Sequence, residues 1–173
     1  MAQKKSIGVL FGILVISVWI LGSGIEAGAE TMKFKVYGYE TKAESVSIGD
    51  VEGHTLALRT RSAFCVLENG EVATQIAVTF GDFIKETGSV ISYQTLTFAD
   101  GSTIITKTEG SIDATAAGPS ASRGKREIIR GTGRFVGIKG TGTGSSKFLP
   151  VEKGEAGPKS VGELILTYTL PRK

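Results

Sequence analysis

The sequence predicts an all-β protein, and three observations support this prediction. Apolar and polar residues alternate along most of the chain after residue 29, which is the pattern of half-buried β-strands. Asn69-Gly70 and Asp100-Gly101 separate such stretches, and both dipeptides are typical of tight hairpins. No long amphipathic helix pattern is present. These features favour an antiparallel sandwich or barrel, and a closed up-and-down barrel is preferred because closure leaves no exposed sheet edge.

The start of the chain predicts a secretion signal. Lys4 and Lys5 precede an uncharged run over residues 6–25, and small residues at 27–29 provide a cleavage site. We expect residues 1–29 to be a cleaved signal peptide and residues 30–173 to form one β-barrel domain. The exported domain would then work in the periplasm or outside the cell, with membrane contact only during export. A retained anchor is the alternative, since about 20 apolar residues span a bilayer.

The expected strands are rich in β-branched and aromatic residues, which suit a pleated sheet. They lie near residues 32–37, 45–48, 56–64, 71–80, 91–98, 104–109 and 163–170. We expect their apolar side chains to face the barrel interior. Residues 81–87 are the one stretch compatible with a short helix. Residues 114–125 and 149–160 contain glycine and proline and are expected to be long loops.

Composition argues against several classes of function. Without the signal, the net charge falls from +3 to +2, because Lys4, Lys5 and Glu26 are removed. The densest basic segment, residues 123–130, has no aromatic residue between its cations, so nucleic-acid binding is not expected. Cys65 is the only cysteine and His54 the only histidine. An internal disulfide is therefore impossible, and no metal or other cofactor is expected.

A cluster of glycines over residues 131–142 is the most distinctive motif. Its spacing does not match a dinucleotide-binding loop, and no helix pattern follows it, so it is not interpreted as a phosphate site. Glycines at these positions instead permit a tight strand–turn–strand, in which an aromatic side chain between them enters the core. The residues of this structural motif are Gly131, Gly133, Phe135, Gly137 and Gly140.

The same motif, Gly131-Thr132-Gly133-Arg134-Phe135-Val136-Gly137-Ile138-Lys139-Gly140, resembles the glycine-rich segment of the allene oxide cyclase and dirigent barrel superfamily. Residues 97–102 resemble the strand and turn before it, and residues 162–168 resemble the closing strand. The resemblance implies a calycin-like, eight-stranded antiparallel barrel with a central cavity, in a family whose members are often oligomeric. Its plant members are a cyclase and proteins that guide radical coupling. The matching positions are architectural, so the fold is carried over and the catalysis is not.

Four residues are candidates for a ligand cavity. Arg59 and Arg61 share one face of a strand whose other face contains Leu56 and Leu58. If the leucines point inward, the arginines face solvent, and this is the preferred interpretation. With the opposite facing, the arginines line the cavity and can hold a carboxylate. Hydroxyl groups at the cavity or its mouth are the other two candidates, Tyr93 and Tyr168. No catalytic set is recognised.

Three functional hypotheses follow. The first is an exported, non-catalytic barrel that binds a small apolar or amphipathic molecule in its lumen, which a barrel of about eight strands can hold. The second is a cyclase- or isomerase-like, or dirigent-like, enzyme that acts by confining a reactive substrate. The third is an oligomeric structural protein of the cell envelope, in which the partner is a second copy of the chain.

Overall fold

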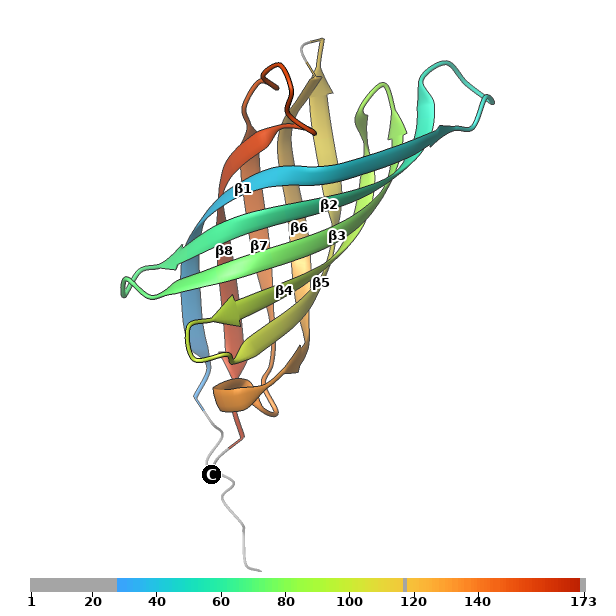
Figure 1. The fold of residues 1–173 in the computed structure, drawn as a ribbon. Coiled ribbons are helices and arrows are strands. Elements are labelled where there is room, and N and C mark those ends of the chain that lie inside the picture. The colour runs from blue at the N-terminus through green and yellow to red at the C-terminus, as the bar shows by residue number, and fades with distance from the viewer. Residues whose placement is uncertain (1–27, 117, 172–173) are drawn as a thin grey trace, which may run out of the picture.

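The protein is a closed eight-stranded antiparallel barrel, as the sequence predicted. The computed structural model describes residues 28–116 and 118–171, and most of the predicted signal peptide lies outside this range. Each strand pairs with its neighbours in sequence, and β1 closes the barrel against β8 (Figure 1). The elements are β1 (Glu30–Ser47), β2 (His54–Leu67), β3 (Val72–Ile84), β4 (Thr87–Phe98), β5 (Thr103–Thr115), β6 (Gly118–Gly131), the 3-10 turn η1 (Gly133–Phe135), β7 (Lys139–Phe148) and β8 (Lys159–Thr169).

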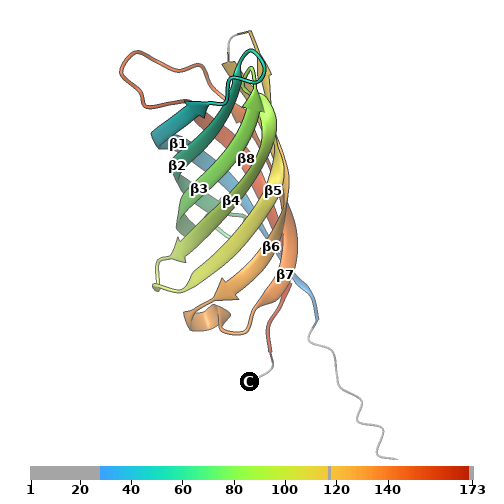
Figure 2. The ribbon, with the colours of Figure 1, turned by 90° about the vertical axis from the view of Figure 1, so that its right-hand side faces the viewer.

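The two ends of the barrel differ. The upper end in Figure 1 contains the β1–β2, β3–β4, β5–β6 and β7–β8 connections, while the lower end contains the other connections and both ends of the described chain. Figure 2 shows the strong tilt of the strands about the barrel axis. No helix among the described residues has the length and apolar character needed to cross a membrane.

A large apolar core fills the lower half of the barrel. It consists of Phe34, Cys65, Leu67, Ala73, Leu96, Phe98, Ile104, Ile128, Phe135, Ile138, Leu164, Leu166 and Tyr168. The glycine motif closes this end: η1 turns the chain between β6 and β7, and Phe135 is 4% exposed with its ring centroid 4.8 Å from that of Phe98. A Cβ on Gly131 would lie 2.2 Å from the Phe135 carbonyl oxygen, so this position requires glycine. The predicted strand–turn–strand is confirmed.

Both predicted hairpins are also confirmed. Asn69-Gly70 joins β2 to β3 and Asp100-Gly101 joins β4 to β5. The glycines have φ values of 85° and 78°, a left-handed conformation that glycine adopts without a steric cost.

Two local predictions are wrong. Residues 81–87 do not form a helix, because β3 and β4 continue to a tight turn at Lys85 and Glu86, whose φ values are both positive. Residues 114–125 are not a long loop, since β5 and β6 remain paired up to Thr115 and Gly118 despite the small residues there. The other predicted loop is correct in large part, because β7 ends at Phe148 and β8 begins at Lys159.

The facing of β2 and β3 is opposite to the prediction. Leu58 is 47% exposed on the outer surface, and the outer face of β3 presents Ile76, Val78 and Phe80. Their polar and small neighbours point inward instead. In this part of the barrel the interior is not a packed apolar core, so the usual rule of apolar residues inside does not apply.

Candidate functional site

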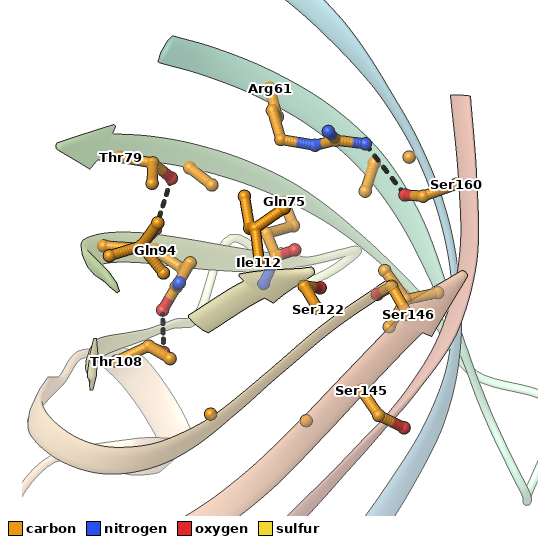
Figure 3. A pocket seen from close by; sticks show the side chains of 18 of the residues that line it. Arg61, Gln75, Thr79, Gln94, Thr108, Ile112, Ser122, Ser145, Ser146 and Ser160 are labelled. Atoms are coloured by element: carbon orange, nitrogen blue, oxygen red, sulfur yellow. Dashed lines mark hydrogen bonds between the residues drawn. The ribbon is translucent and has the colours of Figure 1, made fainter. Parts of the chain in front are cut away.

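The upper half of the barrel lumen contains a cavity of about 120 Å³ above the apolar core. We call it the polar chamber, because most side chains that line it inside the barrel are polar (Figure 3). Its polar lining comprises Arg59, Arg61, Gln75, Thr79, Ser92, Gln94, Thr108, Ser122, Arg126, Ser146 and Ser160. Every strand contributes at least one lining residue.

Small residues on one wall leave this space open. The inward positions of β6 and β7 beside the chamber include Ser122, Gly124, Gly144 and Ser146. Gly144 has a specific role, because a Cβ there would lie only 3.2 Å from Nε of Arg126. The missing side chain therefore accommodates the Arg126 guanidinium against the wall.

Several polar groups of the chamber bond to one another. Oε1 of Gln94 accepts hydrogen bonds from the hydroxyls of Thr106 and Thr108, at 2.8 and 2.9 Å. The hydroxyls of Thr79 and Ser92 are 2.8 Å apart. Figure 3 shows some of these bonds along the wall. These groups are satisfied by the protein, as buried polar groups normally are.

Arg59 and Arg61 point into the lumen and share one buried carboxylate. Oε2 of Glu40 lies 3.9 Å from Nη1 of Arg59 and 4.0 Å from Nη1 of Arg61. Nη2 of Arg59 also bonds to Glu86 at 3.1 Å. Burial raises the pKa of Glu40, although the two arginines favour its charged form. Burial also disfavours the charged form of Arg61 and so lowers its pKa.

The β7–β8 loop covers part of the upper end. Arg61 donates hydrogen bonds from Nη2 to the hydroxyl of Ser160, at 2.8 Å, and to the carbonyl oxygen of Pro158, at 3.3 Å. The loop approaches so closely that a Cβ on Gly157 would lie 2.2 Å from Oε1 of Glu40. The arginine therefore fastens the loop to the barrel wall.

A small apolar cluster borders the chamber at the top. It consists of Ala57, Phe83 and Ile112, with Val90 and Phe148 packed against them. The guanidinium of Arg59 lies 5.0 Å from the centre of the Phe83 ring, and that of Arg61 lies 5.0 Å from the centre of the Phe148 ring. The chamber thus has an apolar floor, a polar middle and an apolar border above.

Arg126 lies between the chamber and the floor. Burial lowers the pKa of this arginine to about 10. The same low-polarity surroundings raise the pKa of the Cys65 thiol to about 11, and the nearby Arg126 charge opposes that rise. Cys65 is fully buried and is therefore a neutral thiol at neutral pH, not an activated nucleophile.

The four sequence-predicted cavity residues have different positions. Arg59 and Arg61 line the chamber, contrary to the preferred outward facing; their role toward a ligand stays a prediction. Tyr93 does not line the cavity: it is 52% exposed on the outer surface, because β4 alternates without a register shift and its inward positions are Ser92, Gln94 and Leu96. Tyr168 is 7% exposed in the apolar floor, where its hydroxyl donates a hydrogen bond to Glu30 at 2.8 Å.

Sequence reasoning missed Arg126 and Gln75. Both lie on inward positions, in phase with the buried residues Ile128 and Ala73 on their strands. That phase was the available signal, and it was masked by the loop assigned to residues 114–125 and by the apolar residues on the outer face of β3.

His54 has a local structural position at the upper end. Its ring nitrogens bond to Asp50 at 2.5 Å and to Asp82 at 2.9 Å, and these bonds raise its pKa. It thereby ties the β1–β2 turn to β3. Within the described part of the chain, no three histidine, cysteine or acidic side chains come close enough to hold a metal ion.

Comparison with known proteins gives distant structural neighbours, including two dirigent proteins. No protein-family model matches the chain. No curated protein matches its sequence either. Among solved structures, the pterocarpan synthase dirigent protein GePTS1 is similar at 16% identity and a TM-score of 0.49, over 92% of this chain and 98% of that one. The pterocarpan synthase dirigent protein PsPTS1 is similar at 16% identity and a TM-score of 0.48, over 84% and 97%.

Proposed function

We propose that this protein is a non-catalytic binding barrel that holds one small amphipathic molecule in the polar chamber. One observation supports this most directly: the upper lumen is open space of about 120 Å³, whereas the lower lumen is filled by side chains. An engineered cavity of about 150 Å³ in another protein is large enough to bind benzene, so a molecule of about one ring fits a space of this size. The arrangement of polar and apolar walls suits a ligand with one polar and one apolar end.

Native mass spectrometry of the protein purified under mild conditions tests this proposal. We expect a bound small molecule, or uptake of one from a panel of single-ring and short-chain compounds. A matched control is Ala77→Leu, which adds an inward side chain to the chamber and should abolish uptake. If the wild-type barrel binds no compound in the panel and the Ala77→Leu protein behaves identically, the proposal is wrong.

We also propose that the domain is exported, on the strength of the N-terminal signal pattern in residues 1–29. N-terminal sequencing of the protein recovered from the periplasm or medium should start at Glu30. Recovery of the full-length chain in the membrane fraction would instead show a retained anchor.

The outer surface favours a second candidate role, self-association. The register places Leu58, Phe80 and Ile91 side by side across β2, β3 and β4, with Val78 and Tyr93 in the adjacent row. All five side chains are between 42% and 52% exposed. Ion pairs flank this apolar face on both sides, Lys42 with Glu44 on β1 and Lys107 with Glu109 on β5. An apolar centre with a rim of both charges is typical of a protein interface, and a rim of both signs suits a second copy of the same chain.

Light scattering with size-exclusion chromatography tests self-association. We expect an oligomer for the wild type and a monomer for Phe80→Glu, which places a charge at the centre of the apolar face. Thr141→Glu is the control, because Thr141 is exposed on the outer face of β7, on the other side of the barrel. A wild-type protein that stays monomeric at all concentrations would refute this role.

A further inference from the structure

The residues that line the lumen have buried hydrogen-bond donors for which no described protein group is an acceptor. Among the described residues, the buried side-chain nitrogens without a hydrogen-bond partner are Nε of Arg59, Nε2 of Gln75, and Nε and Nη1 of Arg126. All three residues line the polar chamber. An unpaired buried donor is destabilising, so a group of them around one cavity indicates a missing acceptor.

Arg126 differs from the other two arginines of the chamber in the charges that surround it. Arg59 and Arg61 lie near Glu40, and Arg59 also pairs with Glu86. No carboxylate within residues 28–116 and 118–171 lies within ion-pair distance of Arg126. The chamber therefore has an excess of positive charge at Arg126, just above the apolar floor. A ligand that satisfies Arg126 must supply both acceptor atoms and negative charge.

We propose that the polar chamber binds a small carboxylic acid as its anion, with the carboxylate on Arg126 and the apolar part directed toward Ile112 and Phe148. This inference rests on the proposed binding function and adds the chemical class of the ligand. Nε and Nη1 of Arg126 are both free and donate in different directions, so a carboxylate oxygen can accept a charge-assisted hydrogen bond from either nitrogen. Gln75 provides a further free donor in the same chamber.

Size and wall chemistry restrict the acid. A space of about 120 Å³ limits the enclosed part to one aromatic ring or a short aliphatic chain. The side chains that line the chamber change from polar to apolar toward Val90, Ile112 and Phe148. An inorganic anion would occupy the space beside Arg126 and leave the apolar border without a contact, so an organic acid fits better than sulfate or phosphate.

Calorimetric titration of the purified barrel with benzoate, benzyl alcohol and inorganic sulfate tests this inference. We expect benzoate to bind at least tenfold more tightly than the other two. Arg126→Gln should weaken benzoate binding at least tenfold. Arg130→Gln, the same change at an exposed arginine of β6, should leave it unchanged. Glu40→Gln should strengthen binding, because it removes the negative charge beside Arg59 and Arg61 and so makes the chamber more positive for an anion. Circular dichroism confirms that each variant folds.

The outcomes separate this inference from the binding function beneath it. If benzyl alcohol and benzoate bind equally well and Arg126→Gln does not change this, the proposal of a binding barrel stands. The proposal that its ligand is a carboxylic acid is then wrong. If sulfate binds as tightly as benzoate, the proposal of an organic ligand is wrong and the chamber is a site for an inorganic anion. Failure of all three compounds to bind, together with no uptake from the wider panel, refutes both proposals.

Discussion

Replacing Arg126 with methionine should stabilise the ligand-free protein, which is an unusual result for removing a residue from a barrel interior. Its Nε and Nη1 are buried without partners, and burial lowers its pKa to about 10 from 12.5 for an exposed arginine. At about 1.36 kcal/mol for each tenfold change in a protonation equilibrium, this displacement represents about 3 kcal/mol of unfavourable desolvation. Methionine is shorter, but it is also unbranched and flexible, and it has no charge to desolvate.

The expected gain is smaller than that figure, because local relaxation and water entry reduce such penalties. We expect Arg126→Met to raise the free energy of unfolding by about 2 kcal/mol, or Tm by about 6 °C for a domain of this size. Denaturant unfolding followed by circular dichroism at neutral pH measures the change. Arg130→Met is the matched control and should change stability by less than about 0.5 kcal/mol, since Arg130 is exposed.

Adding ligand should reverse the order of stability of the wild type and Arg126→Met. A bound acid stabilises the wild type in proportion to the logarithm of its concentration over Kd, whereas Arg126→Met gains little. If the variant is more stable without ligand and is not stabilised by benzoate, the wild-type arginine lowers stability but is needed for binding. Such a trade-off is common at functional sites. Destabilisation of Arg126→Met by more than about 1 kcal/mol would refute the reasoning, because it would mean that the protein itself pairs the guanidinium.

Three further predictions concern the rest of the barrel. Phe135→Ala should lower the free energy of unfolding by about 3–5 kcal/mol, because it empties the lower core, whereas Val136→Ala at a 65% exposed position should cost little; denaturant unfolding distinguishes them. Cys65 should not react with a thiol reagent such as Ellman's reagent in the folded protein, since it is fully buried and its pKa is raised to about 11; rapid native labelling would contradict this. Bonds to Asp50 and Asp82 raise the pKa of His54, so the stabilisation of the β1–β2 turn is fully present below the ordinary histidine value of 6.5 and is lost as pH rises through the folded-state value. Hydrogen exchange at the Ile48 amide, which bonds to the His54 carbonyl oxygen, should become faster over that range after correction for intrinsic rates, and a pH-independent protection factor would refute the role of His54.

Much of the fold follows from local sequence signals. Asn69-Gly70 and Asp100-Gly101 determine two hairpins through the conformational freedom of glycine, and the glycine motif around Phe135 determines the closed lower end. These signals are readable because each acts over a few residues and has one favourable backbone geometry. The number of strands came from the family resemblance, not from periodicity alone.

The facing of β2 and β3 was not readable in the same way. Alternation shows that two faces differ but does not state which face is inside. Along β3 the large apolar residues Ile76, Val78 and Phe80 lie outside, because the inward positions beside an open chamber are small or polar. Arg59 and Arg61 were misplaced for this reason. In a barrel with a hollow lumen and an apolar outer face, the rule that apolar side chains point inward assigns the two faces of a strand the wrong way round.

The polar chamber was even less accessible to sequence reasoning, since it combines inward residues from all eight strands. Arg126 directly follows the segment 114–125 that was predicted to be a loop, and its exceptional property is that no carboxylate among the described residues pairs with it. That property depends on the whole barrel and has no local pattern. Only the three-dimensional register shows that Gly144 makes room for the guanidinium.

The most direct test of the account is a crystal structure of the protein with 4-bromobenzoate, in which bromine is located by its anomalous signal. The account predicts one molecule inside the barrel. Its carboxylate lies within hydrogen-bonding distance of Nε or Nη1 of Arg126, and its bromine points toward the upper end, beside Ile112 and Phe148. A bromine peak only on the outer surface, or Arg126 bonded to a protein carboxylate in an otherwise filled lumen, would contradict it.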